Sequence, residues 1–491
     1  MRSQVTTTLL ISSYKRPPMK LWSLTTVVAA IVVSACGGSG SVSTLIAPPK
    51  NIIFFLGDGM GLTTMTAARI YKVGESGDLT MDTLPETAFI KTFSANAQVT
   101  DSAPSMAAYM TGVKMNNEVI SMTSETSAFD PVTLKDFVAG ADTTCPTSGN
   151  GKPVTTLVEL AKAAGMGTGV ITTTRITHAT PAATYAHICH RDGENTIAAQ
   201  MVPSGAGYNA ALGDGVDVFM GGGLRHFLPK ETSGSSRTDS RDLVAEMKNA
   251  GYNYAASKSD FDKLPATGKI LSLFTSSHMA YDIDRDSTKE PSLAEMTSRS
   301  IDQLKANSRG FFLMVEGGRI DHALHETTAR KALQDTVAFD DAIKVAIDKM
   351  RVIDPDLKNT LIVVTADHDH TLVLNGYSAL TGKTTEANPG VLGLLRSYVT
   401  GLLANDKTGN PFTIIGFGNG ENRPMARTAL TDVQVFDKNY HQEATIPTAA
   451  GSETHGGADV FLGAIGKGAD NFAGVMDNTA VFGLIRKAMG L

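Results

Sequence analysis

The sequence predicts an α/β fold, in which a doubly wound, mostly parallel sheet is sandwiched by helices. The first observation is a set of short, uninterrupted apolar runs, which are typical of strands buried on both faces. The second is that helical stretches alternate with these runs. The third is that polar residues follow several runs directly, at the place where open parallel sheets form their sites. The expected strands span residues 51–56, 168–173, 216–220, 311–315, 360–365 and 460–465.

Two of the expected helices cover residues 153–165 and 327–350. In the second, Phe339, Ile343 and Ala346 recur on one face, as in a helix that packs on a sheet. Residues 115–150 and 376–450 break the alternation, and the second region is rich in residues that favour turns. We therefore expect one large domain over residues 49–491 that carries two insertions, at about 115–150 and 376–450.

Length and composition describe an acidic globular protein. The 491 residues are 42% hydrophobic, which is enough for a sizeable core, and they carry a net charge of -6. This composition excludes a mainly disordered chain, and the 47 glycines follow no collagen-like spacing. Because no basic stripe with interleaved aromatic residues is present, we expect no nucleic-acid-specific binding.

The N-terminal segment has the features of an export signal. Basic residues precede an apolar run over residues 21–33, which is too short to span a membrane. The run ends in Val-Ser-Ala-Cys at Cys36, which resembles the lipobox of bacterial lipoproteins. We therefore expect a signal peptide over residues 1–35, starting at Met1 or Met19. A lipidated Cys36 would then attach the protein to a membrane through a flexible tether over residues 36–48.

An ordinary secretory signal with an incidental cysteine is the alternative. Both interpretations place the mature chain outside the cytoplasm, in the periplasm or at the cell surface. Gly37 stands where an aspartate would retain a lipoprotein at an inner membrane, so the outer membrane is favoured.

Two further cysteines, Cys145 and Cys189, remain for the exported chain. In an oxidising compartment such a pair favours a disulfide, with two free thiols as the alternative. The sequence does not set the distance between them.

Side chains that can bind metal ions gather at the ends of the expected strands, most of them directly after a strand and His455 just before the last one. Each alone has an ordinary explanation, because an Asp in Gly-Asp-Gly is usually part of a turn and an Asp-His pair is common on surfaces. Their joint occurrence, with no thiolates among them, suits catalytic Zn²⁺ and carboxylate-bound Mg²⁺. The candidates are Asp58, His178, Thr180, Glu316, Asp321, His322, His325, Asp367, His368 and His455.

Ser102 is a candidate nucleophile. Asp101 or Thr100 can cap a helix there, and Pro104 suits its first turn. Ser102 would then lie at a helix N-terminus, where backbone N–H groups favour an anion. A serine that merely caps the helix is the ordinary explanation; a hydroxyl activated by a nearby metal ion is the functional one.

Together, these motifs resemble the alkaline phosphatase family. The resemblance runs from about residue 50 to 486 and rests on residues 51–61, 99–114, 174–191, 310–329, 363–371 and 451–462. It implies a metal-dependent phosphomonoesterase that uses two Zn²⁺ and one Mg²⁺ and forms a phosphoserine on Ser102. It further implies a homodimer, with residues 376–450 in the region that forms the dimer crown of the animal-type branch.

The resemblance also implies ligand sets. The first Zn²⁺ would be held by Asp321, His325 and His455. The second would be held beside Ser102 by Asp58, Asp367 and His368. The Mg²⁺ would be held by Asp58, Thr180 and Glu316.

The same resemblance assigns the phosphate-binding residues. Arg191 would bind phosphate while Asp101 holds the arginine in place. His178 and His322 resemble the animal-type branch, where His178 would touch Mg²⁺, and His322 phosphate, only through water. His370 would support Asp321. Thr275 stands where the calcium site of that branch has a glutamate, so we expect no calcium site.

Three other functions are alternatives. A sulfatase is disfavoured because Met106 stands where the signal for formylglycine formation has an arginine. A phosphodiesterase of the same superfamily usually lacks the pair formed by Glu316 and Thr180. A lipid-anchored, non-enzymatic metal- or phosphate-binding protein would not need Ser102. The positive charge expected at the site favours a phosphate monoester dianion over a singly charged diester.

Overall fold

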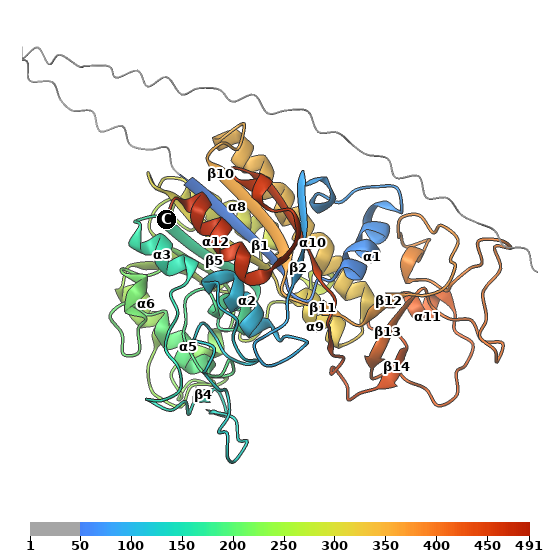
Figure 1. The fold of residues 1–491 in the computed structure, drawn as a ribbon, viewed down its shortest axis with the longest axis horizontal. Helices are drawn as coiled ribbons and strands as arrows, with labels where there is room; N and C mark the ends of the chain where they lie inside the picture. The colour runs from blue at the N-terminus through green and yellow to red at the C-terminus, as the bar shows by residue number, and fades with distance from the viewer. Residues whose placement is uncertain (1–49) are drawn as a thin grey trace, which may run out of the picture. The chain divides into compact units, whose positions relative to one another are not determined.

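A ten-stranded sheet forms the core of the protein (Figure 1). The computed structural model describes residues 50–491, so the expected signal peptide, Cys36 and the tether lie outside the described residues. The strands lie in the order β17-β2-β16-β10-β1-β9-β5-β6-β8-β7. In that order they span Gly474–Asp477, Glu86–Lys91, Val460–Gly466, Thr360–Ala366, Lys50–Gly57, Gly310–Gly317, Gly167–Arg175, Val218–Gly222, Lys269–Leu273 and Tyr252–Ala255.

All six expected strands are present, as β1, β5, β6, β9, β10 and β16. The central strands β9 and β10 are buried along their whole length, which explains their uninterrupted apolar runs. The sheet is mostly parallel, but β16 is antiparallel to both of its neighbours, β10 and β2. The sequence did not predict β2, β7, β8 and β17, which lie near the sheet edges: β2, β7 and β17 are only partly buried, and β8, although mostly buried, is a short strand interrupted by Ser272.

Helices cover both faces of the sheet (Figure 1). Phe54 packs on Tyr109 of α2, whereas the next residue, Phe55, packs on Phe339 of α10. Successive side chains of a strand point to opposite faces, so α2 and α10 cover opposite sides. The helices are α1 (Leu62–Val73), α2 (Ser102–Thr111), α3 (Leu157–Ala163), α4 (Ala179–Ala182), α5 (Glu194–Gln200), α6 (Leu243–Asn249), α7 (Lys258–Phe261), α8 (Leu293–Leu304), α9 (Arg319–His325), α10 (Ala329–Ile353), α11 (Asp432–Phe436) and α12 (Asn478–Met489). No helix among residues 50–491 is long and apolar enough to cross a membrane.

Two helices begin later than expected. The expected helix over 153–165 begins only at Leu157, because Thr156 caps it and exchanges hydrogen bonds with Glu159. Pro153 instead pairs with Met122 in an isolated β-bridge. The helix expected from residue 327 begins at Ala329, because Thr327 has a φ of 55°, outside the helical region.

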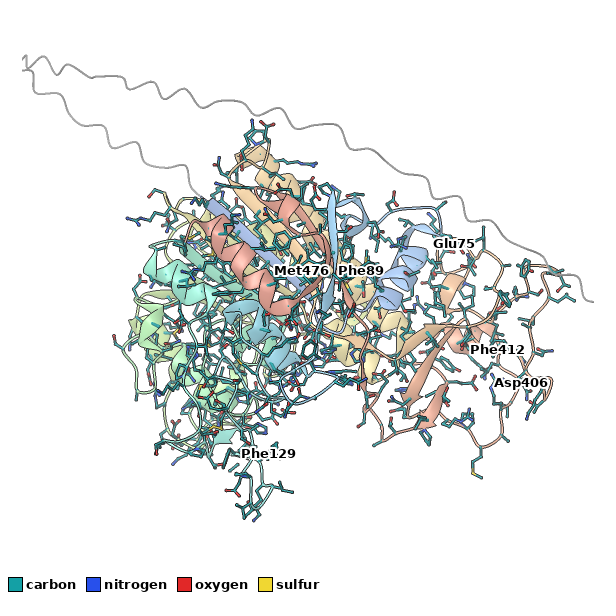
Figure 2. The ribbon with its side chains drawn as sticks, in the orientation of Figure 1. Glu75, Phe89, Phe129, Asp406, Phe412 and Met476 are labelled. Carbon is teal, nitrogen blue, oxygen red and sulfur yellow. A yellow bond between two sulfur atoms is a disulfide. The ribbon has the colours of Figure 1, made fainter. Side chains whose placement is uncertain are left out.

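The first of the two expected insertions, residues 115–150, is an excursion of the chain from the central sheet. It contains a short hairpin of β3 (Val138–Ala139) and β4 (Asp142–Thr143). Phe129 lies on its projecting part (Figure 2). Cys145 forms a disulfide with Cys189, so the expected bridge is confirmed. The disulfide attaches this excursion to the segment that carries Arg191 two residues later.

The second insertion, residues 376–450, forms an excursion in which β13 (Ile415–Gly420) and β14 (Ala444–Pro447) make a three-stranded sheet with β12 (Leu372–Leu374), the strand just before it. Arg427 joins Asp406 and Glu443 within it, each at 2.6 Å. Asp406 and Phe412 lie on this excursion, and Glu75 lies where it meets the rest of the protein (Figure 2). The Glu75 carboxylate accepts hydrogen bonds from the backbone N–H groups of Thr381 and Gly382, which connects the excursion to the end of α1.

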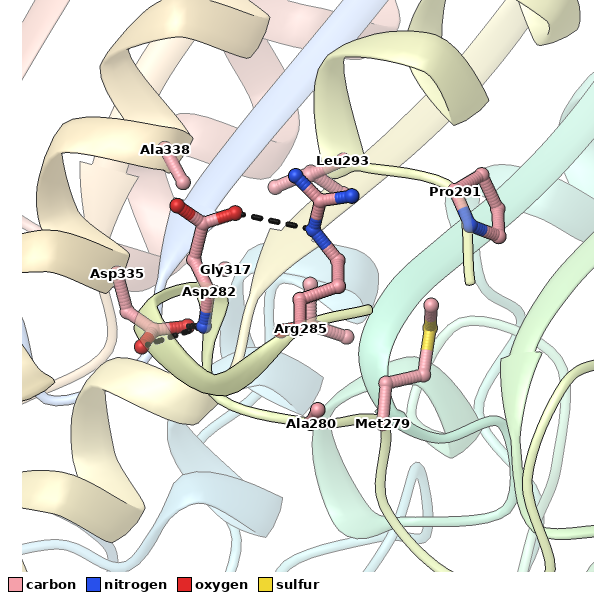
Figure 3. Close-up of a pocket in the computed structure, with 10 residues that line it drawn as sticks. Met279, Ala280, Asp282, Arg285, Pro291, Leu293, Gly317, Asp335 and Ala338 are labelled. Atoms are coloured by element: carbon pink, nitrogen blue, oxygen red, sulfur yellow. Dashed lines mark hydrogen bonds and ion pairs between the residues drawn. The ribbon is translucent and has the colours of Figure 1, made fainter. Parts of the chain in front are cut away.

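A small cavity of about 20 Å³, room for one water, lies beside α10 (Figure 3). Asp335 lines it and accepts a hydrogen bond from the backbone N–H of Asp282 at 3.2 Å. Asp282 in turn pairs with Arg285 at 3.1 Å. Burial, followed by the charge of Asp282, raises the pKa of Asp335 to about 8. This carboxyl is therefore expected to stay protonated in the folded protein at neutral pH.

We expect Asp335→Asn to stabilise the protein more at pH 8 than at pH 5. Between the ordinary pKa of 3.8 and about 8, the folded protein keeps a proton that the unfolded chain has lost. The stability of the unmodified protein therefore falls as pH rises through this window, whereas Asn cannot ionise. The gain should be on the order of 1–3 kcal/mol at pH 8 and shrink toward pH 4. Thermal unfolding across this range measures it. Asp341→Asn on the exposed face of α10 is the control, and equal gains at pH 5 and pH 8 would contradict the assignment.

Candidate active site

The candidate residues converge at one edge of the central sheet. The carboxyl ends of β1, β9 and β10 lie side by side, because Gly57 is in register with both Gly317 and Ala366. β16 runs in the opposite direction, so its amino end lies at this same edge. The topology therefore brings the segments that follow β1, β9 and β10 together with the segment that precedes β16.

Ser102 is the first residue of α2 and lies within this convergence. The Asp101 side chain caps the helix by accepting a hydrogen bond from Ala103 N–H at 2.8 Å, as expected. The Ser102 hydroxyl lies 3.3 Å from Asp58 Oδ1 and 3.2 Å from His368 Nε2, and only 2% of the residue is exposed. The structure thus brings the candidate nucleophile into contact with two of the expected metal ligands.

Asp58, Asp367 and His368 form one group of potential ligands, with one ligand atom from each within 4.8 Å of the others. Asp367 Oδ1 accepts hydrogen bonds from the backbone N–H groups of Gly59 and His368, both at 3.0 Å, but its buried Oδ2 has no hydrogen-bond partner among residues 50–491. His368 Nδ1 faces the carbonyl of Asp369 at 3.3 Å, which assigns the proton to Nδ1. The Nε2 lone pair of His368 therefore faces Asp58 and Asp367, as in a metal site.

The turn after β1 requires glycine at position 59. Gly59 has a φ of +65°, and a Cβ there would lie 2.5 Å from His370 Nε2. The Gly-Asp-Gly motif therefore makes a tight turn, and the same turn places Asp58 among the ligands.

Asp321, His325 and His455 form a second group. His325 Nδ1 contacts the carbonyl of Glu453, and His455 Nδ1 lies 2.8 Å from the carbonyl of Thr100. These contacts assign the ring proton of each histidine to Nδ1, which leaves a lone pair on each Nε2. The two Nε2 atoms lie 3.2 Å from each other. Asp321 Oδ1 lies 3.2 Å from Nε2 of His325 and 3.6 Å from Nε2 of His455. Three electron-pair donors that face one another repel unless a cation lies among them.

Asp58, Thr180 and Glu316 form a third group, next to His178. Thr180 Oγ1 lies 3.3 Å from Asp58 Oδ2, and ligand atoms of Asp58, His178 and Glu316 lie within 4.8 Å of one another. Glu316 Oε1 is buried and has no hydrogen-bond partner in the described part of the chain. This oxygen-rich set is the kind that Mg²⁺ prefers.

The electrostatics of the two groups that contain Asp58 also fit divalent cations. Burial, followed by the charge of Asp321, raises the pKa of Asp58 to about 7. Burial, followed by the charge of Asp58, raises the pKa of Asp367 to about 8 and also raises the pKa of Glu316. Buried carboxylates at this density are costly to ionise unless positive charge compensates them. The residues present therefore fit bound metal ions.

The candidate phosphate-binding residues lie beside these groups. Arg191 Nη1 donates to Asp101 Oδ1 at 2.9 Å, and Arg191 Nη2 lies 3.2 Å from His178 Nε2. His322 Nδ1 lies 2.7 Å from Arg319 Nη1, and its ring centroid is 5.4 Å from that of His178. Burial, followed by the charge of Arg191, lowers the pKa of His178 well below its ordinary value, so this imidazole is neutral.

Sequence reasoning missed several residues that support these groups. Thr172 and Thr174 donate hydrogen bonds to Glu316 Oε2, and Glu453 contacts His370 and His325. His278 packs its ring against His322, with centroids 4.2 Å apart. The threonines follow one another at a spacing of two along β5, which places them on one face of the strand, but Glu453 and His278 carry no comparable signal in the sequence.

Comparison with known proteins identifies the family. The family model described as alkaline phosphatase matches residues 49–491. An alkaline phosphatase of Gadus morhua is 36% identical over 464 residues, covering 88% of this chain and 90% of that protein. A membrane-bound alkaline phosphatase of Bombyx mori is 35% identical over 471 residues, covering 88% and 78%.

Solved structures agree with this result. The cold-active enzyme of a psychrophilic Shewanella has a TM-score of 0.61 and 26% identity, covering 89% of this chain and 99% of that chain. The Thermus thermophilus enzyme has a TM-score of 0.63 and 24% identity, covering 91% and 92%, and this likeness concerns the fold alone. On this evidence the chain belongs to the alkaline phosphatase family and is an enzyme that hydrolyses phosphate monoesters.

Proposed function

We propose that hydrolysis proceeds through a phosphoserine on Ser102, at a site that holds two Zn²⁺ and one Mg²⁺. The observation that carries this proposal is the contact of the Ser102 hydroxyl with both Asp58 and His368 at the start of α2. Asp321, His325 and His455 would hold the first Zn²⁺; Asp58, Asp367 and His368 the second; and Asp58, Thr180 and Glu316 the Mg²⁺, with His178 reaching it through water. When bound, the metal ions would supply positive charge that favours the serine alkoxide and the departing oxygen.

The chain's own residues position the two displacements. Ser102 Oγ, after losing its proton to solvent, attacks phosphorus in line as the bond to the ester oxygen breaks, and that oxygen takes a proton from solvent so that the product leaves as an alcohol. Arg191 is held by Asp101 and presents its planar fork to two of the other phosphate oxygens. Water then attacks the phosphoserine from the opposite side, the bond to Ser102 Oγ breaks and phosphate leaves. Most of the rate acceleration would come from positioning and charge, as in phosphoryl transfer generally.

We expect Arg191→Ala to weaken inhibition by inorganic phosphate more than His322→Ala does. Alanine removes the guanidinium and with it the two charge-assisted hydrogen bonds proposed to phosphate, each worth about 1.5–3 kcal/mol, so the inhibition constant should rise at least about 100-fold. His322 would reach phosphate through water, so its removal should raise the constant less. Inhibition constants for both variants check this, and equal effects would rule out the water-mediated role.

Activity on mono- and diesters tests the substrate class. Rates on nitrophenyl phosphate and bis-nitrophenyl phosphate, with and without a chelator, are compared. We expect the monoester to be hydrolysed faster and both activities to depend on metal. A preference for the diester, or for nitrophenyl sulfate, would favour the corresponding alternative.

We propose further that residues 49–491 form the catalytic domain and that a signal peptide precedes Cys36. Cys36 would be lipidated and attach the enzyme, through residues 36–48, to the outer membrane, facing the periplasm or the outside. This proposal rests on the sequence of residues 21–40. Mass spectrometry of the mature N-terminus tests it: an unmodified terminus after Cys36, or an intact Met1, would refute the anchor without affecting the catalytic proposal.

We also propose a homodimer. The excursion over 376–450 exposes large apolar side chains, including Tyr377, Tyr398 and Leu402, which are 84%, 69% and 69% exposed. Such a concentration is typical of a surface that binds another protein. The molar mass in solution tests the proposal, and a monomer at micromolar concentration would contradict it.

A further inference from the structure

We propose that Glu453 is a positioning residue that sets the geometry of the first zinc site. The inference rests on the zinc site proposed above, but it concerns a residue outside that ligand set. Glu453 is 1% exposed, so its carboxylate is almost fully removed from water. A buried carboxylate is costly unless its oxygens are fully hydrogen-bonded, and these are.

The carboxylate of Glu453 connects directly to a neighbour of the ligands. Its Oε2 lies 2.5 Å from His370 Nδ1, and its Oε1 accepts hydrogen bonds from the backbone N–H of Thr371, at 2.8 Å, and from the Thr371 hydroxyl. The other ring nitrogen of His370 lies 2.8 Å from Asp321 Oδ1. Glu453 therefore orients His370, and His370 orients Asp321. The carboxylate oxygens of Glu453 face His370 and Thr371, so we assign the residue to orienting the ligands, although its ligand atoms also lie within 4.8 Å of those of His325 and His370.

The backbone of Glu453 reaches a second ligand. Its carbonyl oxygen contacts His325 Nδ1, and this contact turns the Nε2 lone pair of His325 toward Asp321 and His455. Glu453 N–H also lies 3.2 Å from the carbonyl of His325, so the two segments are held together in both directions. Rotation of the Glu453 backbone would therefore move His325 out of place.

The third ligand lies on the same segment as Glu453. His455 follows two residues later and pairs with His370 in the two-stranded ladder of β11 (Asp369–His370) and β15 (His455–Gly456). Thr454 between them exchanges hydrogen bonds with the side chain of Asn419 at 2.8 and 2.9 Å, which ties the segment to β13. Glu453 is thus connected to all three ligands of the first zinc site: to Asp321 through His370, to His325 by its backbone, and to His455 by lying on the same segment. That segment is in turn hydrogen-bonded to Asn419 of the second excursion.

The contacts of Glu453 also predict which metal ion is affected. None of its hydrogen bonds reaches Asp367, Thr180 or Glu316, which belong to the other two sites. Outer residues that orient metal ligands typically contribute 10–100-fold to metal affinity. We expect Glu453→Gln, which keeps the size but removes the charge, to weaken one zinc site by about this factor and leave the second zinc and the magnesium in place.

The test is a chelator titration of the loaded enzyme. The zinc and magnesium contents of each chain are measured after dialysis against graded concentrations of a zinc chelator. In Glu453→Gln, one zinc should leave at a roughly 10–100-fold lower chelator concentration than in the unmodified protein. Added zinc should then restore the initial rate. The control is Glu421→Gln, because Glu421 accepts a hydrogen bond from Gly451 N–H on the same stretch but contacts none of the ligands.

Several outcomes would overturn the inference. Unchanged zinc retention in Glu453→Gln would contradict the inference. Parallel loss of both zinc ions and magnesium would also contradict it, because it would indicate that the substitution destabilises the whole active site. If Glu453→Gln does not fold, Thr371→Val provides the test, because it removes one donor to the carboxylate and should weaken the same zinc site less. A failure of the proposed function would look different: the unmodified protein itself would not hold two zinc ions.

Discussion

Ser102→Ala is expected to lower the turnover of a phosphate monoester by at least about 10³-fold. The Ser102 hydroxyl lies within 3.3 Å of both Asp58 and His368, and no other serine among residues 50–491 donates a hydrogen bond to either. Removing it leaves phosphorus without its covalent acceptor, while the residues that bind phosphate stay in place. Substrate binding should therefore change less than turnover, which steady-state kinetics on nitrophenyl phosphate separates.

Ser300→Ala is a matched control for this prediction. Ser300 is equally buried in a helix, but its hydroxyl donates only to the carbonyl of Met296 in its own helix. Rapid acid quench with labelled substrate should trap phosphate on Ser102 in the unmodified protein and on no residue in Ser102→Ala. Label recovered on another residue, or full turnover without Ser102, would refute the covalent role.

Removal of bound metal ions is expected to abolish activity and to lower the melting temperature. Asp58, Asp367 and Glu316 are three buried carboxyl groups whose pKa values are raised by burial and by nearby carboxylates, so they are costly to ionise unless cations compensate their charge. A ligand present at 100 to 1,000 times its dissociation constant stabilises the folded state by about 3–4 kcal/mol per site. The loss should therefore amount to many degrees in thermal unfolding with and without a chelator.

The Ser102→Ala variant separates stability from catalysis in this experiment. It keeps every proposed ligand, so the chelator should lower its melting temperature as much as that of the unmodified protein. Zinc and magnesium together should restore the melting temperature in both proteins and activity only in the unmodified one. An unchanged melting temperature after complete metal removal would contradict the proposed arrangement of the carboxylates.

The fold was predictable where burial leaves a continuous pattern. β1, β9 and β10 are covered on both faces, and their apolar runs identified them directly. β2 is half exposed and β7 and β17 have four residues each, so no comparable run marks them. Pro153, the first residue of the helix expected over 153–165, instead forms a β-bridge with Met122. A helical spacing of apolar residues cannot predict such a contact with a distant segment.

The residues of the candidate site likewise fall into those that local sequence identifies and those that only tertiary contacts bring in. Asp58, Asp367 and His368 follow strands directly, and Asp321 and His325 share one turn of α9, so local sequence was enough to single them out. Glu453 contacts a residue 83 positions away, and His278 meets His322 only through the packing of separate segments. Such pairings depend on which segments the sheet order brings together, and no local pattern records them.

The chemistry of this protein can be inferred from its amino-acid sequence: a serine at a helix start, nitrogen and oxygen ligands at the ends of apolar strands, and motifs shared with one enzyme family. How those groups face one another depends on the tertiary structure. His455 precedes its strand, yet it joins the residues that follow theirs because β16 runs antiparallel to β10. Backbone carbonyls of Glu453 and Thr100 determine which nitrogens of His325 and His455 are free. Strand direction and the direction of a lone pair depend on contacts between distant segments, and these form only when the chain folds.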